Sequence, residues 1–123
     1  MQNDKLEFKN EFKRRIYTFA LDIIKFIEAL PKDKTCEIIG SQLLRSATSI
    51  GANIVEANSA SSRKDYINFF QYALKSANET KFWLGLLRDS NKTSKDRSNK
   101  LLMETKEMSN IIASSILTLK GKR

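Results

Sequence analysis

Apolar residues recur along the chain at helical spacing, in four successive segments of similar length. Within each segment they stand three or four residues apart, which places them on one face of a helix. We expect helices over residues 4–30, 36–58, 62–90 and 95–119. Because short links return each helix antiparallel to the one before, the pattern predicts an all-α fold, an antiparallel up-down-up-down four-helix bundle forming a single domain over residues 1–123.

The expected links carry ordinary helix-ending and helix-starting residues. Pro31 stops the first helix, and either Asp33 or Thr35 is suited to cap the second. Ser62 followed three residues later by Asp65 resembles a capping box at the start of the third helix. These residues support the helix boundaries that the periodicity predicts.

The second helix carries very few charges. Between Ile38 and Val55, Arg45 is the only charged residue among 18. One interpretation is a weakly charged face in solvent. The other is a helix buried on both sides, by its own bundle and by another subunit. We favour the second, because interface cores are depleted in charged residues.

Two stripes on the second and third helices are candidate interface elements. Their members, spaced three or four residues apart, are Arg45, Ser49, Asn53 and Glu56 on one helix and Tyr72, Ser76, Glu79 and Trp83 on the other. The aromatic pair is interpreted either as chance exposure with Trp83 leaning inward against the first helix, or as a partner surface, where Tyr and Trp are enriched. Arg45 with Glu56 or Glu79 would make a charge pair that fixes register.

The composition excludes several kinds of site. The chain has no His, which excludes a Ser-His-Asp triad and imidazole metal ligands, and its single Cys excludes a thiolate zinc site and an internal disulfide. No run of 18 apolar residues or signal segment is present, so we expect a cytoplasmic protein without a membrane partner. We therefore expect no cofactor, no metal and no enzymatic activity.

Positive charge is in excess and unevenly distributed. Lys and Arg number 22 against 14 Asp and Glu, for a net charge of +8, and residues 91–123 alone carry +5. The predicted topology places the third link at the same end as the basic first link. Candidate nucleic-acid-binding residues around the third link are Arg88, Lys92, Lys95, Arg97 and Lys100. A merely solvated surface is the alternative. No aromatic residue interleaves them, which favours phosphate contacts over base reading.

The run over residues 44–57, Leu-Arg-Ser-Ala-Thr-Ser-Ile-Gly-Ala-Asn-Ile-Val-Glu-Ala, resembles a known bacterial family. These are four-helix-bundle proteins encoded in intervening sequences of 23S rRNA genes, and the family includes the accessory variability protein of diversity-generating retroelements. Ala57 and Lys75 stand where the family usually has Gly. The matching positions are Arg45, Ser49, Ile50, Asn53, Ile54, Glu56, Ala73, Ser76 and Glu79.

The resemblance implies a ring-like homopentamer with a basic surface, in which +8 per chain becomes +40 over five chains. For the retroelement branch it implies binding of nucleic acid and of a reverse transcriptase. It implies no enzymatic activity. The predicted function is a non-enzymatic basic adaptor that binds RNA or DNA. The alternatives are a protein-interaction scaffold without nucleic-acid binding and, ranked last, a ribonuclease using Arg, Glu and Ser.

Overall fold

The chain folds into four long α-helices. The computed structural model describes residues 2–121, with side chains from residue 7 onward, and no strand occurs in that range. The helices are α1 (Gln2–Glu28), α2 (Lys34–Ala57), α3 (Arg63–Asp89) and α4 (Lys95–Leu119). The prediction of an all-α chain with four helices is confirmed. No helix within residues 2–121 is long and apolar enough to cross a membrane.

Local chemistry explains where the first two helices end and begin. α1 ends at Glu28, two residues before the predicted boundary, because a residue that precedes proline, here Leu30, is disfavoured in helical conformation. α2 begins two residues early, at Lys34, because Asp33 is its N-cap. The Asp33 carboxylate accepts a hydrogen bond of 2.8 Å from the Cys36 N–H. Of the two predicted caps, the structure therefore uses Asp33 and not Thr35.

The capping box at the start of α3 forms in altered form. The Ser62 hydroxyl accepts a hydrogen bond of 3.0 Å from the Asp65 N–H, as predicted. The Asp65 carboxylate accepts in return from the N–H of Ser61, at 3.3 Å, rather than from that of Ser62. The α3–α4 link turns at Asn91, whose φ of 60° lies in the left-handed region that Asn tolerates better than most residues. Each link is thus built from polar residues that cap a helix or turn the chain.

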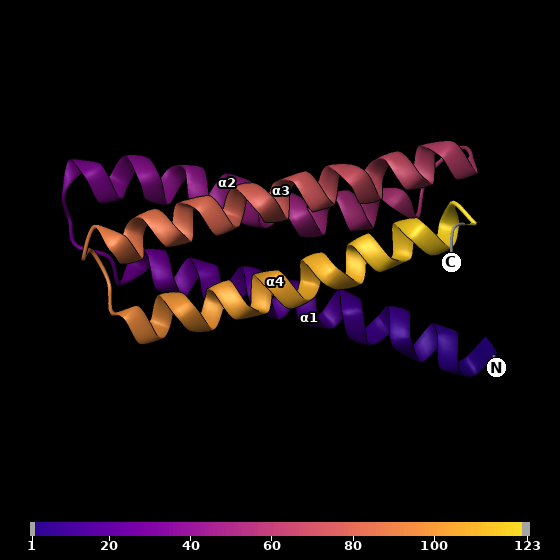
Figure 1. Cartoon of the computed structure of the whole chain (residues 1–123), viewed down its shortest axis with the longest axis horizontal. Helices are drawn as coiled ribbons and strands as arrows, with labels where there is room; N and C mark the ends of the chain where they lie inside the picture. The colour runs from indigo at the N-terminus through magenta and orange to yellow at the C-terminus, as the bar shows by residue number, and fades with distance from the viewer. Residues whose placement is uncertain (1, 122–123) are drawn as a thin grey trace.

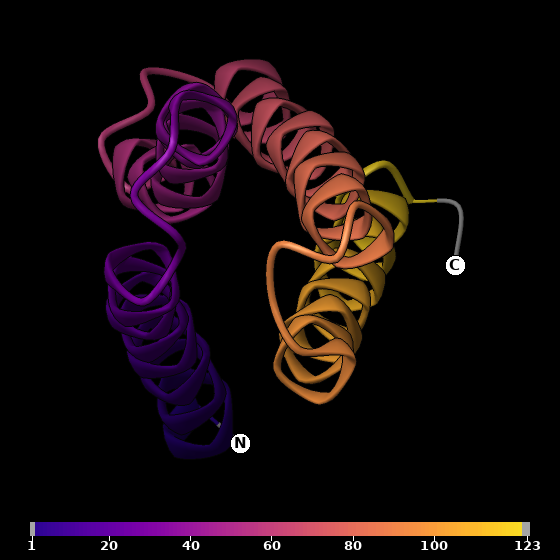
Figure 2. The ribbon, with the colours of Figure 1, turned by 90° about the vertical axis from the view of Figure 1, so that its left-hand side faces the viewer.

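Consecutive helices run back and forth along the long axis of the molecule (Figure 1). The α1–α2 and α3–α4 links lie together at one end, which we call the link end. The α2–α3 link, the start of α1 and the end of α4 lie at the other, which we call the terminal end (Figure 1). Seen from the link end, α2 and α3 lie next to each other, α1 lies below α2, and α4 lies below α3 (Figure 2). The α2–α3 contact is the most extensive and the α1–α4 contact the smallest.

The buried positions differ in size between helices. α1 buries large side chains, including Phe19, Ile23 and Phe26. α2 and α3 bury small residues beside their larger ones, and these small residues are Ser46, Ala47, Ala73, Ala77 and Thr80. Thr80 Oγ1 lies 3.0 Å from Ser46 Oγ, so a buried hydroxyl pair joins the two helices. Small residues let α2 and α3 approach closely, whereas the bulk of the α1 side chains keeps α1 at a greater distance.

Two contacts fasten α1 near its middle. A Cβ at Gly51 of α2 would lie only 2.7 Å from Ile16 Cγ2, so α1 seats against a position that has no room for a side chain. On the opposite side the Arg15 guanidinium donates to both carboxylate oxygens of Glu104 of α4, at 2.6 and 2.8 Å. These hydrogen bonds raise the pKa of Arg15, and Glu107 adds a contact of 3.4 Å. From this point towards its start, α1 diverges from α4 (Figure 1).

Candidate functional site

The predicted charge pair on the α2–α3 face forms between Arg45 and Glu79. The Arg45 guanidinium contacts the Glu79 carboxylate and also donates to the Gln42 side-chain oxygen, at 2.9 Å. Glu56, the other candidate partner, is exposed, and no ion pair with Arg45 forms there. In the isolated chain the pair is itself largely exposed, with 55% of the Arg45 side chain and 36% of the Glu79 side chain accessible.

Trp83 leans inward rather than outward. Its ring is partly buried and packs against the core, and its indole N–H donates to the Glu79 carboxylate at 2.9 Å. The expected lean against α1 does not occur, because α1 and α3 make no close approach. The residue that faces outward is the neighbouring Phe82, 60% exposed, whose ring meets Trp83 edge-to-face at 5.0 Å. Sequence reasoning missed Phe82. Successive residues of a helix lie about 100° apart, so an inward Trp83 leaves Phe82 on a different, outward side of α3.

The Glu79 carboxylate accepts hydrogen bonds from two side chains, Arg45 of α2 and Trp83 of α3. The Trp83 indole, and after it Arg45, lower the pKa of Glu79 below its ordinary value of 4.5. The carboxylate therefore stays ionised over the neutral range. It links α2 to α3 through Arg45 and fixes the orientation of an aromatic ring through Trp83.

Two further polar side chains of the α2 stripe, Ser49 and Asn53, bond to their own helix. Ser49 Oγ donates to the Arg45 carbonyl at 2.7 Å, and the Asn53 side-chain amide donates to the Ser49 carbonyl at 2.8 Å. The Ser76 carbonyl lies 2.8 Å from Thr80 Oγ1. Because Ser49 and Asn53 find partners within α2, covering these two side chains would not leave the donated groups unsatisfied.

The outer face of α2 and α3 also exposes several large apolar side chains. Tyr72, the aromatic residue predicted to face outward, is 51% exposed. The other members are Ile38 of α2 and Phe82 and Leu86 of α3. Single exposed apolar residues are ordinary on a monomer, but a set on one face with one ion pair across it is typical of an interaction surface. We call this surface the α2–α3 outer face.

The five predicted nucleic-acid-binding residues gather at the link end but differ in their contacts. Lys92 Nζ lies 3.1 Å from Asp33 Oδ2, which joins the two links. Arg88 donates to the carboxylate of Asp89 at 2.8 Å and to the Asn99 side chain at 2.8 Å. The hydrogen bond from the Cys36 N–H and then that from Lys92 lower the pKa of Asp33. Arg88 and Lys92 are thus partly neutralised by carboxylates.

Lys95, Arg97 and Lys100 are exposed on the first two turns of α4. The Arg97 guanidinium lies 5.8 Å from the centre of the Phe26 ring of α1, within cation–π range. Arg97 and Lys100 line a cavity of about 740 Å³ between α1 and α4, and Lys25 of α1 lines it with them. Sequence reasoning missed Lys25, because its approach to α4 depends on which helices are neighbours.

No group of three or more His, Cys, Asp or Glu residues within the described range is arranged to hold a metal ion. Cys36 is buried, and burial is the main cause that raises the pKa of its thiol. The thiol is therefore protonated and shielded from solvent at neutral pH.

Comparisons with known proteins agree on one family. A family model described as 23S rRNA-intervening sequence protein matches residues 9–114. A crystal structure of a protein with unknown function from the S23 ribosomal protein family of Bacteroides thetaiotaomicron VPI-5482 is similar at 36% identity, with a TM-score of 0.80. It covers 85% of this chain and 97% of its own. No curated protein matches the chain.

Proposed function

Because the chain belongs to the 23S rRNA-intervening sequence protein family, we propose that it is a non-enzymatic, basic, oligomeric adaptor that binds nucleic acid through phosphate contacts. The observation that carries the proposal is the exposed set Lys95, Arg97 and Lys100 at the start of α4. These residues belong to the part of α4 at the link end. The net charge of +8 favours the approach of a polyanion.

Phosphate contact is the favoured mode because of what surrounds these cations. The aromatic ring nearest to them, that of Phe26, is only 1% exposed and offers no stacking surface to a base. Lysine and arginine side chains contact phosphate oxygens without reading base edges. We therefore propose binding that tolerates any sequence, in RNA or DNA.

The oligomeric part of the proposal rests on the α2–α3 outer face. Its exposed apolar side chains, its single ion pair and its internally bonded polar groups suit a surface covered by another copy. A homopentamer is the form that the family resemblance implies, and the positions of the links support an antiparallel up-down-up-down subunit. In such a ring each subunit adds a link end, so several basic surfaces would act together on one nucleic acid.

Light scattering of the purified protein tests the oligomer. We expect a mass several times the 14.1 kDa of one chain at micromolar concentration. Replacing the outward Phe82 with Glu should shift the mass towards one chain, because a charge would enter an apolar contact. Met103→Glu, at an exposed position of α4, is the matched control. A clean monomer for the unmodified protein would refute the oligomer.

A salt titration tests the nucleic-acid proposal. Labelled RNA and DNA of mixed sequence are titrated with the protein at several salt concentrations. Because each neutralised phosphate releases counterions, log affinity should fall with log salt at a slope of about −0.9 per contact on duplex and about −0.7 on single strands. Affinity should not depend on base sequence. Absence of binding at low salt would contradict the proposal, as would binding that is indifferent to salt.

The alternative of a protein-interaction scaffold is favoured by one observation, the several large apolar side chains exposed on the α2–α3 outer face. It predicts oligomer or partner binding through that face without retention of nucleic acid. Association with a reverse transcriptase rests on the resemblance to the retroelement branch alone. The same salt titration separates the scaffold from the adaptor.

A further inference from the structure

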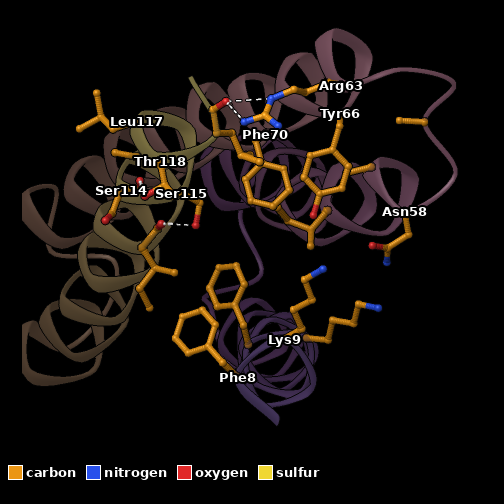
Figure 3. Close-up of a pocket in the computed structure, with 18 of the residues that line it drawn as sticks. Phe8, Lys9, Asn58, Arg63, Tyr66, Phe70, Ser114, Ser115, Leu117 and Thr118 are labelled. Atoms are coloured by element: carbon orange, nitrogen blue, oxygen red, sulfur yellow. Dashed lines mark hydrogen bonds between the residues drawn. The ribbon is translucent and has the colours of Figure 1, made fainter. Parts of the chain in front are cut away.

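A second surface, at the terminal end, has a different character from the link end. Where α1 diverges from α4, a groove of about 1600 Å³ opens between them, floored by α2 and α3. Phe8 and Phe12 of α1 line one wall, and Tyr66 and Phe70 of α3 line the floor (Figure 3). The Tyr66 and Phe70 rings stack at 5.0 Å, and burial raises the pKa of Tyr66. The groove is thus an apolar trough open to solvent.

The far wall of the groove is the last part of α4. Its lining runs from Asn110 to Leu119, about 14 Å of helix at 1.5 Å per residue. The Arg63 guanidinium donates to the Leu119 carbonyl at 3.0 Å through Nε, which ties the end of α4 to the start of α3. Figure 3 shows this bond above the stacked rings. Both walls are therefore helical, and one end of the groove is held in place by a side chain.

Every charged residue that lines the groove is positive. Lys9 and Lys13 stand on the α1 wall and Arg63 on the opposite rim, and no Asp or Glu lines the groove in the described part of the chain. Lys9 and Lys13 are both exposed. A second copy of this basic chain is a poor electrostatic match for such a rim, whereas an acidic partner is attracted to it.

The volume and length of the groove indicate which kind of ligand it fits. Pockets for small ligands measure about 300–1,000 Å³, which is less than this groove. An amphipathic helix docks in an apolar groove through anchors at i, i+3, i+4 and i+7, a span of about 11 Å that fits the α4 wall. A nucleic acid would meet the cationic rim but would leave its charged backbone over an apolar floor.

We propose that the groove between α1 and α4 at the terminal end is a docking site for an acidic amphipathic helix of a partner protein. The apolar face of that helix packs on Phe8, Phe12 and Phe70, and its carboxylates meet Lys9, Lys13 and Arg63. The site lies at the opposite end from Lys95, Arg97 and Lys100, so one subunit holds a protein partner and a nucleic acid at the same time.

Fluorescence anisotropy with model peptides tests the docking site. The probe is a labelled peptide of about 18 residues, long enough to reach appreciable helicity, with Leu at i, i+3, i+4 and i+7 and Glu on the other face. A scrambled peptide of the same composition and a peptide with Lys in place of Glu are the comparison probes. We expect the acidic amphipathic peptide to bind and both others to bind at least tenfold more weakly, a difference of about 1.4 kcal/mol or more.

Two variants locate the peptide in the groove. Lys9→Glu with Lys13→Glu should weaken binding about tenfold or more, because two attractive contacts with the carboxylates of the peptide become repulsive. The matched control is Lys64→Glu with Lys106→Glu, which changes the net charge equally at exposed positions that do not line the groove. Ser115→Trp should also weaken binding, because an indole would fill the space beside the α4 wall.

Three results would overturn the docking site. One is equal binding of the scrambled or the basic peptide. Another is equal loss of binding in the groove variant and in its charge-matched control. The last is a change in oligomer mass on Ser115→Trp, which would show that a second copy occupies the groove. Circular dichroism of each variant checks that the helix content is unchanged. If Ser115→Trp does not fold, the Lys9 and Lys13 double variant still tests whether the peptide binds in the groove, because both residues are exposed.

Discussion

Reversal of Lys95, Arg97 and Lys100 to glutamate in one variant is expected to abolish nucleic-acid binding at physiological salt and to leave the helices intact. All three side chains are exposed, and none belongs to the core. A glutamate at position 95, the first residue of α4, also suits the positive end of the helix dipole. The loss would therefore report electrostatics and not unfolding.

The expected size of this effect follows from the number of contacts. Three lost phosphate contacts at about 1 kcal/mol each weaken binding on the order of a hundredfold per subunit, before repulsion by the new carboxylates is counted. The salt slope on duplex should become shallower by about 0.9 for each lost contact. Lys92 is left unchanged, because its reversal would place a carboxylate against Asp33, the N-cap of α2.

A charge-matched variant separates position from total charge. Arg14, Lys64 and Lys106 are exposed and lie outside the link-end cluster. Reversing these three lowers the net charge from +8 to +2, as the first variant does. Binding should be mostly retained in this control. Equal loss in both variants would show that net charge attracts the nucleic acid without a defined site.

Replacement of Glu79 with Ala is expected to break the oligomer. In a single chain the Arg45–Glu79 pair is exposed, and such pairs contribute about 0–1 kcal/mol. If the α2–α3 outer face is covered by another subunit, removal of Glu79 leaves Arg45 buried and unpaired, which costs about 3–5 kcal/mol. Arg45→Ala should have a similar effect. For each of the two variants, light scattering measures the oligomer mass, and thermal melting at several protein concentrations measures its stability.

The pH dependence of the assembly, and the variant Glu79→Gln, test the same role of the Glu79 carboxylate. The folded-state pKa of Glu79 is lowered, so its carboxylate contributes stability above its ordinary value of 4.5 and loses that contribution as the pH falls below it. The assembly should weaken in that acid range, and Glu79→Gln should flatten the dependence. Glu28→Ala, at an exposed position of α1, is the control. Unchanged mass and melting in both Glu79→Ala and Arg45→Ala would contradict a structural role for the pair.

The helices were predictable, and the sequence narrowed the partner of Arg45 to Glu56 or Glu79, because each depends on information within one or two neighbouring helices. The 3.6-residue period defines a helix locally, and Asp33 or Ser62 caps it locally. Arg45 and Glu79 lie on adjacent helices joined by a short link, so their stripes could be aligned from sequence.

Features that join distant segments were not predictable in this way. The Arg15–Glu104 contact and the approach of Lys25 to α4 require the register between the first and last helices, which no local pattern carries. The inward lean of Trp83 accompanies a hydrogen bond from its indole to Glu79. Trp83 lies at the edge of the apolar stripe, where helical periodicity does not decide between a buried and an exposed side chain. The groove depends on the divergence of α1 from α4, which is a relation between the first and last helices.

The unequal size of buried residues also determines where the chain tolerates substitution. On α3, Ala73 and Ala77 are 0% exposed, so a larger residue at either position would overpack the core. On α1, the buried residues Phe19 and Phe26 are already large. Exchange of either for another large apolar residue changes the core volume less than enlarging an alanine does. Sequence variation in the core should therefore be concentrated on α1, where a new shape is accommodated by repacking.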